Sequence, residues 1–181
     1  MVSNNGVVIN RVWAMPNRWT FTIKPIAELL SRYVGDGRDW IDPFAGMYSP
    51  AEFTNDLNPE MPTLCHDDAL DFLGLFAWLP FKGALFDPPY SITQARQCYN
   101  GFGFDELKIK PTSMKYWAEV KNRLSQMIEV GGLALCFGWS SMGLGKNRGF
   151  EMLEILLVPH GGSKNDTICT VERKVSDCGD G

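Results

Sequence analysis

The sequence has few of the residues that metal sites and disulfide frameworks require. It contains two histidines and five cysteines, and no two cysteines form a CxxC pair. An odd number of cysteines without paired spacing argues against a disulfide framework and against a zinc site, and it favours a reducing compartment. We therefore expect no metal-centred chemistry and a cytoplasmic location.

Long hydrophobic runs are also missing. The longest apolar stretches, residues 133–137 and 155–158, have the length of strands and are too short to span a bilayer. The N-terminus has no basic region followed by an apolar core, so we expect no signal peptide. A chain of 181 residues is expected to form a single domain over residues 1–181, with a frayed tail from 175 to 181.

Net positive charge is absent too, because the formal charge is −4. This value does not mark the chain as a nucleic-acid binder, but a local basic face is sufficient for binding. Five basic residues and one acid occur in one stretch, which is equally consistent with a solvated helix face: Lys108, Lys110, Lys115, Lys121 and Arg123, with Glu119.

Four strand-like segments are each followed by an acid. These acids are Asp42, Asp56, the pair Asp67 and Asp68, and Asp87. Helical spacing of apolar residues predicts helices over 26–34, 69–78 and 113–130, the last capped by Gly131 and Gly132. The alternation predicts a doubly wound, mostly parallel α/β sheet with helices on both faces. In such a sheet all four acids would lie along one edge, where ligands bind.

The C-terminal part is expected to end the sheet. Residues 133–137 predict a buried strand, and residues 138–149 a glycine-rich loop that lacks a dinucleotide-binding pattern. Residues 152–159 and 166–174 predict two strands that form a hairpin. The last strand would therefore run antiparallel to the others.

The stretch Asp87-Pro88-Pro89-Tyr90 has the composition of a clamp for an amino group. Two successive prolines fix the backbone and donate no N–H, so the carbonyls before them lack ladder partners. The Asp87 carboxylate and the Pro88 carbonyl would accept the two N–H groups of an exocyclic amine, and Tyr90 offers a flat face for its ring. The alternative is an ordinary Asp-Pro turn at a strand end.

The motifs KPI, DPFAG, NDLNP, DDALDFL and DPPY occur in this order. In this respect the chain resembles small adenine-specific (N6) DNA methyltransferases of bacteriophage and bacterial type, over roughly residues 10–174. The resemblance implies a Rossmann-like class I methyltransferase fold with a seven-stranded sheet, and S-adenosylmethionine as cofactor. It also implies DNA as substrate, with an adenine that is flipped out of the duplex or already unpaired. The expected setting is a bacterial cell or a phage-infected host.

The resemblance assigns roles to individual residues. Asp87, Pro88, Pro89 and Tyr90 match the catalytic motif. The cofactor would be bound at four places. Its methionine part would lie on the loop Asp42, Pro43, Phe44, Ala45 and Gly46, its ribose hydroxyls on Asp56, its adenine near Asp67 or Asp68 with Ala69, and its carboxylate near Thr22, Lys24 and Pro25.

The chain has little room for choosing a target sequence. Only 18 residues separate Asp68 from Asp87, so we expect no separate target-recognition domain. Specificity would come from residues 91–112, from the loop 139–149, or from a partner, either a second copy or a separate specificity protein. The expected nucleic-acid contacts are Ser91, Trp139, Lys146 and Arg148.

Alternatives to DNA adenine methylation remain. The enzyme could act on cytosine N4 or on RNA adenine, although Asp87 in place of serine favours adenine. A protein glutamine methyltransferase usually has asparagine at this position. The chain could also be a non-catalytic subunit of a methyltransferase pair, which the intact DPPY motif argues against.

Overall fold

A computed structural model describes residues 2–4, 6–89, 114–162 and 165–177. Tyr90, Ser91 and the segment 91–112 lie outside the described residues, as does the chain end from 178. No helix in the described part of the chain combines the length and hydropathy needed to cross a membrane. The elements, in chain order, are β1 (Val2–Asn4), β2 (Val7–Arg11), η1 (Thr20–Thr22), α1 (Lys24–Tyr33), β3 (Trp40–Asp42), β4 (Phe53–Thr54), α2 (Ala69–Leu75), β5 (Phe81–Phe86), α4 (Met114–Met127), β6 (Ile128–Gly138), η4 (Lys146–Arg148), β7 (Phe150–Val158) and β8 (Thr167–Lys174).

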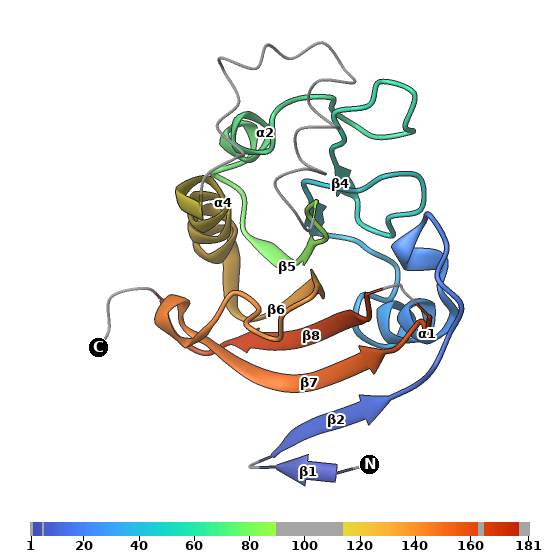
Figure 1. Cartoon of the computed structure of the whole chain (residues 1–181). Helices are drawn as coiled ribbons and strands as arrows, with labels where there is room; N and C mark the ends of the chain where they lie inside the picture. The colour runs from blue at the N-terminus through green and yellow to red at the C-terminus, as the bar shows by residue number, and fades with distance from the viewer. Residues whose placement is uncertain (1, 5, 90–113, 163–164, 178–181) are drawn as a thin grey trace.

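The strands form one sheet in the order β1-β2-β7-β8-β6-β5-β3-β4 (Figure 1). Strands β4, β3, β5 and β6 are parallel neighbours, and β2 is parallel to β7. Strand β8 pairs antiparallel with both β6 and β7, so the expected antiparallel last strand is confirmed. The α/β fold class is confirmed as well. The N-terminal strands β1 and β2 extend the sheet to eight strands in the described part of the chain.

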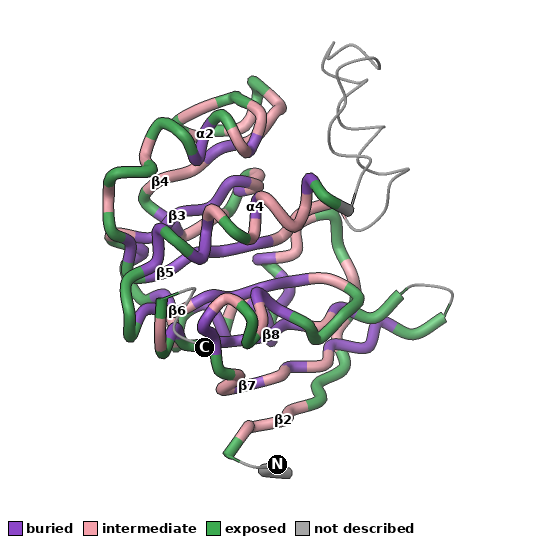
Figure 2. The backbone as a smooth tube through the Cα atoms, turned by 90° about the vertical axis from the view of Figure 1, so that its left-hand side faces the viewer, coloured by how far each residue is buried: buried purple, intermediate pink, exposed green. Residues whose placement is uncertain are grey.

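Helices cover both faces of this sheet. Helix α1 packs Ile26, Leu29 and Leu30 into one core, against side chains of β3, β5, β6, β7 and β8. Helices α2 and α4 lie side by side and pack into a second core on the other face. Neighbouring residues of one strand enter opposite cores, as Trp40 and Ile41 do, which is the two-residue period of a strand. Figure 2 shows that buried residues concentrate in the central strands, whereas β2 is less buried.

Helix α1 begins and ends where its sequence predicts. Pro25 occupies the first turn, where a missing N–H costs nothing. Gly35 and Gly37 follow the helix with positive φ angles of 64° and 74°. A Cβ on Gly37 would lie 1.7 Å from the Pro50 carbonyl oxygen, so this turn also needs a glycine for space.

The boundary between α4 and β6 differs from the prediction. The helix ends at Met127 and the strand begins at Ile128, so Gly131 and Gly132 lie inside β6 and do not cap a helix. The reason is a tertiary contact: Ile128 pairs with Phe81, and the regular ladder resumes only at Leu133 after an irregularity. The local sequence around a glycine pair is the same signal for a helix end and for such a bulge, so it cannot separate the two.

A buried carboxylate ties the N-terminal strands to the rest of the molecule. Glu154 of β7 is 1% exposed and accepts hydrogen bonds from side chains of β2 and α1. The donors are Asn10 Nδ2 (2.9 Å), Tyr33 Oη (2.8 Å) and both terminal nitrogens of Arg32 (2.9 and 3.1 Å). Burial alone would raise the pKa of Glu154, but these hydrogen bonds together lower it.

We predict that Glu154→Ala lowers the free energy of unfolding by about 1–3 kcal/mol, because half-buried Asn10 and Tyr33 lose the acceptor that they share with exposed Arg32. Because the pKa of Glu154 is lowered on folding, its contribution is present above the unfolded value of about 4.3 and is lost as the pH falls. Urea unfolding at pH 7 and at pH 4 measures both effects. Glu151→Ala, at an exposed position of the same strand, is the control. Equal losses in the two variants at pH 7 would contradict the prediction.

Candidate active site

The four predicted acid positions lie at one edge of the sheet. Asp42 ends β3, Asp87 directly follows β5, and Asp56 follows β4. A parallel bridge between Asn55 and Cys65 continues the sheet beyond β4 and is followed by Asp67 and Asp68. Because these segments are parallel, their carboxyl ends meet at the same edge, as expected for a ligand-binding α/β sheet.

Two carboxylates hold the loop between β3 and β4. Asp42 is fully buried and accepts hydrogen bonds from the Phe44 amide (2.9 Å) and the Ser49 hydroxyl (2.6 Å). Asp56 accepts from the amides of Gly46 (3.1 Å) and Asn58 (2.8 Å). Gly46 has a positive φ of 57°, which a residue with a side chain rarely adopts. The loop backbone is therefore fixed by side chains rather than by a helix.

The charges at this edge repel one another. The pKa of Asp42 is raised to about 7, mainly by burial; the nearby charges of Asp87 and Asp56 add to this rise, and the hydrogen bonds from Ser49 and Phe44 oppose it. Burial also raises the pKa of Asp56. Clustered acids with raised pKa values are typical of functional sites, where they are retained at a cost in stability.

Asn55 connects the two sides of the site. Its buried amide donates to the carbonyl oxygens of Pro43 (3.2 Å) and Asp67 (2.9 Å), and its oxygen accepts from the Asp67 amide (2.9 Å). One side chain therefore sets the spacing between the loop after β3 and the segment before α2. Sequence reasoning did not select Asn55, although it stands within the quoted NDLNP motif.

Asp67 and Asp68 have different surroundings. Asp68 caps α2 by accepting from the Leu70 amide (2.9 Å), and its other oxygen accepts from the Tyr116 hydroxyl (2.8 Å). Ala69, the first residue of α2, is buried in the core. The Asp67 side chain is exposed. Asp68 thus positions the helix, while the Asp67 side chain is open to solvent, and cofactor contact by either acid stays a prediction.

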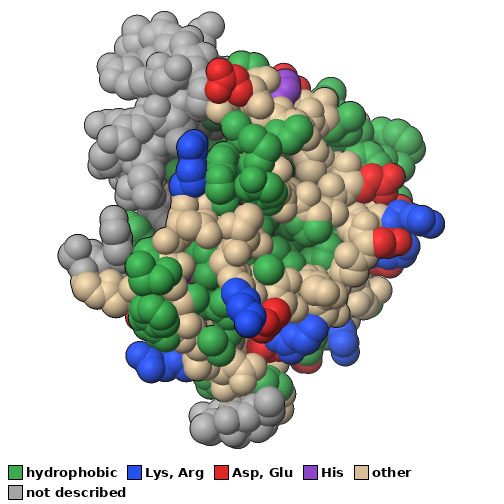
Figure 3. All heavy atoms as spheres, turned by 90° about the vertical axis from the view of Figure 1, so that its right-hand side faces the viewer, with side chains coloured by type: hydrophobic (Ala, Val, Ile, Leu, Met, Phe, Trp, Pro, Cys, Tyr) green, Lys and Arg blue, Asp and Glu red, His purple; other side chains and the backbone are tan. Residues whose placement is uncertain are grey.

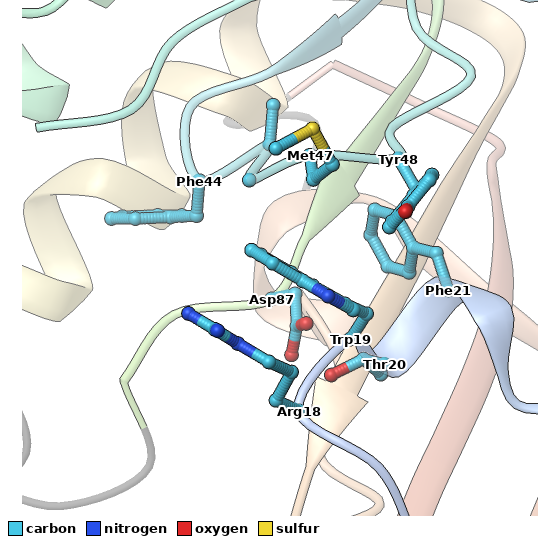
Figure 4. Close-up of a pocket in the computed structure, with 10 residues that line it drawn as sticks. Arg18, Trp19, Thr20, Phe21, Phe44, Met47, Tyr48 and Asp87 are labelled. Atoms are coloured by element: carbon cyan, nitrogen blue, oxygen red, sulfur yellow. The ribbon is translucent and has the colours of Figure 1, made fainter. Parts of the chain in front are cut away.

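A cavity of about 170 Å³ lies between the loop after β3 and Asp87 (Figure 4). In Figure 4, Asp87 lies beside Trp19, with Phe44, Met47 and Tyr48 across the cavity. The complete lining is Arg18, Trp19, Thr20, Phe21, Phe44, Ala45, Gly46, Met47, Tyr48 and Asp87. The cavity thus combines one carboxylate, aromatic rings and a guanidinium group.

The N-terminal side of this cavity was missed by sequence reasoning. The Arg18 guanidinium lies over the Trp19 ring, 4.5 Å from its centroid, and Trp19 meets Tyr48 edge-on at 5.7 Å. The ring of Trp19 also lies 3.7 Å from the position of a Cβ on Gly46. The sequence signal for Arg18 and Trp19 is a cation next to a tryptophan, just before the segment with Thr22 and Lys24 that was assigned to the cofactor.

Thr22 and Lys24 are close to the cavity in sequence but do not line it. The Thr22 hydroxyl donates to the Trp19 carbonyl (2.9 Å) and contacts Asn17, and Lys24 is exposed at the start of α1. Their contact with the cofactor stays a prediction. Pro88 and Pro89 are half-buried after β5, and Tyr90 lies outside the described residues.

The loop after β6 begins at the edge of the sheet that carries Asp87 and ends at the opposite edge, because η4 directly precedes β7 and β7 runs parallel to β6. Trp139 stands at the first edge, and Lys146 and Arg148 stand at the opposite one. Trp139 directly follows β6 and is 46% exposed, and Lys146 is exposed. Arg148 is held by protein groups: its Nε donates to Asn122 (2.8 Å) and a terminal nitrogen to the Leu144 carbonyl (2.7 Å). The loop itself is anchored on buried Glu172, which accepts from the amides of Leu144 and Gly145. Nucleic-acid contacts by these residues stay predictions.

No protein-family model and no curated protein matches the sequence. Solved structures match in fold. One is SMU.776, a candidate methyltransferase in complex with SAH, with 12% identity, a TM-score of 0.56, and coverage of 82% of this chain and 48% of that one. Another is TrmN from Thermus thermophilus, with 15% identity, a TM-score of 0.51, and coverage of 84% and 49%. The chain has the class I methyltransferase fold. It spans about half the length of these two proteins.

We predict that Asp68→Ala lowers the free energy of unfolding by about 1–3 kcal/mol, because it removes a helix cap and the acceptor of the Tyr116 hydroxyl. Asp67→Ala, at an exposed side chain, should change it by less than about 0.5 kcal/mol. Denaturant unfolding of the two variants checks this difference. A larger loss for Asp67→Ala would reverse the two roles.

We also predict a dependence of stability on pH from Asp42. Its folded pKa of about 7 lies above the unfolded value of about 3.9, so the folded protein binds an extra proton between these values. The contribution of Asp42 to stability is therefore lost as the pH rises from about 4 to about 7. Asp42→Asn, which keeps an acceptor for the Phe44 amide, should decline less in stability over this interval than the natural chain. The exposed Asp36→Asn variant should keep the natural slope, and an unchanged slope in Asp42→Asn would contradict the assignment.

Proposed function

We propose that the chain transfers a methyl group from S-adenosylmethionine to the N6 amine of adenine in DNA. The observation that carries this proposal is the cavity between Asp87 and the loop after β3, at the carboxyl edge of a class I methyltransferase sheet. There an amine held by Asp87 would lie next to a cofactor held by the loop.

The lining of the cavity suits the methionine end of this cofactor. Aromatic rings and a carboxylate favour a positively charged sulfur, and Arg18 suits a carboxylate. The volume of about 170 Å³ is below the ~300 Å³ of pockets that enclose a whole ligand, so the nucleoside would lie outside the cavity. Asp56 and Asp67 follow neighbouring segments along the same edge. Asp56 accepts two amides, but a carboxylate has about four acceptor positions and can still bind ribose hydroxyls.

The proposed chemistry requires positioning more than acid–base catalysis. When bound, S-adenosylmethionine supplies a methyl group on a sulfonium, and its S–C bond breaks with the electron pair staying on sulfur. The N6 lone pair is delocalised into the purine ring and is a weak nucleophile. Asp87 and the Pro88 carbonyl would accept its two N–H groups and draw the nitrogen toward tetrahedral geometry, so that the new N–C bond can form. The surplus proton then leaves to water, and the gain comes from orientation and electrostatics.

The alternatives differ in the base and in the nucleic acid. Cytosine N4 and RNA adenine carry the same kind of amine, and the described part of the clamp would hold either. We favour DNA adenine because Asp87 stands where serine would favour cytosine, and because the motif order resembles the adenine-specific enzymes. The non-catalytic alternative predicts no transfer at all.

The test is methyl transfer from labelled S-adenosylmethionine. Single-stranded DNA, duplex DNA and RNA are incubated with the protein, digested to nucleosides and separated. We expect N6-methyladenine from DNA. N4-methylcytosine, or product from RNA alone, would replace the proposed target, and no product on any substrate would contradict the proposed activity.

Asp87→Ala should lower the rate of transfer by about 100-fold or more, the typical loss for one electrostatic group at a reacting centre. Binding of S-adenosylhomocysteine, measured by calorimetry, should stay within about threefold, because Asp87 is only one of several cavity groups. The exposed Asp71→Asn variant on α2 should keep full activity. Full transfer by Asp87→Ala would show that the clamp lies elsewhere.

A further inference from the structure

The N-terminal segment has an unusual composition. Residues 11–19 read RVWAMPNRW and contain two arginines, two tryptophans and no acid. Residues 1–27 contain three basic residues and no acid, a formal charge of +3, whereas the whole chain has −4, so residues 28–181 carry −7. The N-terminal segment is thus locally basic in an acidic chain, and a local basic face is sufficient to bind a polyanion.

The backbone of this segment is held in place. The Val12 amide donates to the Leu157 carbonyl (3.0 Å) and the Ala14 amide to the Pro159 carbonyl (3.2 Å). Buried His160 bridges the Ala14 carbonyl and the Thr167 hydroxyl, at 2.8 Å each. In Figure 1 the segment runs along one side of the molecule from the end of β2 to η1. Ordering of this backbone is therefore complete before any ligand binds, which lowers the entropic cost of binding.

The side chains on this backbone point outward. Trp13 is 60% exposed and Met15 is 67% exposed, while Arg11 and Arg18 are exposed cations. The Trp13 indole lies against Gly161, where a Cβ would be 3.4 Å from its Nε1. Figure 3, which shows the side of the molecule where this segment runs, has hydrophobic side chains exposed together with separate Lys and Arg side chains. Exposed aromatic and cationic side chains therefore stand side by side on this segment.

The segment leads directly into the candidate active site. Its last residues, Arg18 and Trp19, line the cavity together with Asp87, and exposed Tyr48 meets Trp19 edge-on. A strand with one base held by Asp87 at the mouth of the cavity would therefore continue over aromatic and cationic side chains. Aromatic faces with interleaved cations are the arrangement that binds unpaired strands without regard to sequence.

We propose that residues 11–19, with Trp13 as the main stacking group, bind an unpaired strand of nucleic acid beside the base that Asp87 would hold at the mouth of the cavity. This inference rests on the proposed function for its choice of ligand, but it concerns binding and requires no methyl transfer. Residues 11–19, an ordered segment at the edge of the sheet, would thus capture the substrate. Recognition would be of single strands and of low sequence specificity.

The test measures binding of fluorescein-labelled single strands of about 12 nucleotides, as DNA and as RNA, by anisotropy without cofactor. Trp13→Ala should weaken binding by about 5- to 100-fold, the range for loss of one stacked base, and Trp13→Phe should stay within about threefold of the natural chain. Trp78→Ala is the matched control. Trp78 is 77% exposed and precedes β5, so it lies at the opposite edge of the sheet from Asp87, and its loss should leave affinity unchanged. Thermal unfolding of each variant checks that the fold is retained.

The outcomes separate this inference from the proposed activity. If the protein binds strands through Trp13 but transfers no methyl group, the result would support the proposed binding surface and contradict the proposed methyltransferase activity. Absence of binding, or equal binding by Trp13→Ala and Trp78→Ala, would overturn the inference even if transfer occurs. Tighter binding of one strand type identifies the nucleic acid and supports the proposal in either case. If Trp13→Ala instead abolishes self-association in sedimentation and leaves strand binding intact, the surface is a contact between copies and the proposal fails.

Discussion

The site depends on a loop that is folded around carboxylates. Strands β3 and β4 are parallel neighbours joined by residues 43–52, a connection with no helix. A parallel crossover normally satisfies its backbone groups within a helix. Here Asp42, Asp56 and the Asn55 carbonyl accept the loop amides instead. The conformation that brings Gly46 to the cavity is therefore set by a few side-chain acceptors.

Holding the loop with carboxylates has an electrostatic cost, because the loop lies beside another acid at the same edge of the sheet. The acceptors Asp42 and Asp56 lie at the edge where the parallel strands end. Asp87 follows the neighbouring strand β5 at the same edge, so the three acids are brought together. Burial is the main cause of the raised pKa of Asp42, and the charges of Asp87 and Asp56 add to it. The acids that hold the loop, Asp42 and Asp56, and the acid proposed to hold the substrate, Asp87, therefore lie on one edge of the sheet. Stability and function are thus opposed in the same few residues.

Much of the site could be predicted because strand ends are visible in the sequence. The acids, the helix start at Pro25 and the antiparallel last strand all follow from local patterns, and the structure places them as expected. The choice between Asp67 and Asp68 could not be made, because it depends on Tyr116, which is distant in sequence. Arg18 and Trp19 were missed for a similar reason. They reach the cavity only because β2 joins β7, a pairing that has no local signal.

The pairing of β2 with β7 also sets where the N-terminal segment lies relative to the candidate site. Because β2 is parallel to β7, the chain leaves it at the carboxyl edge, on the same side as the acids. Residues 12–19 must then cross from this far end of the sheet to α1, and they pass the cavity on the way. An added recognition domain would need its own core, whereas this crossing uses a backbone that the sheet already holds. Topology alone therefore brings an acid-free segment with exposed aromatic side chains to the edge of the sheet that carries the four acid positions.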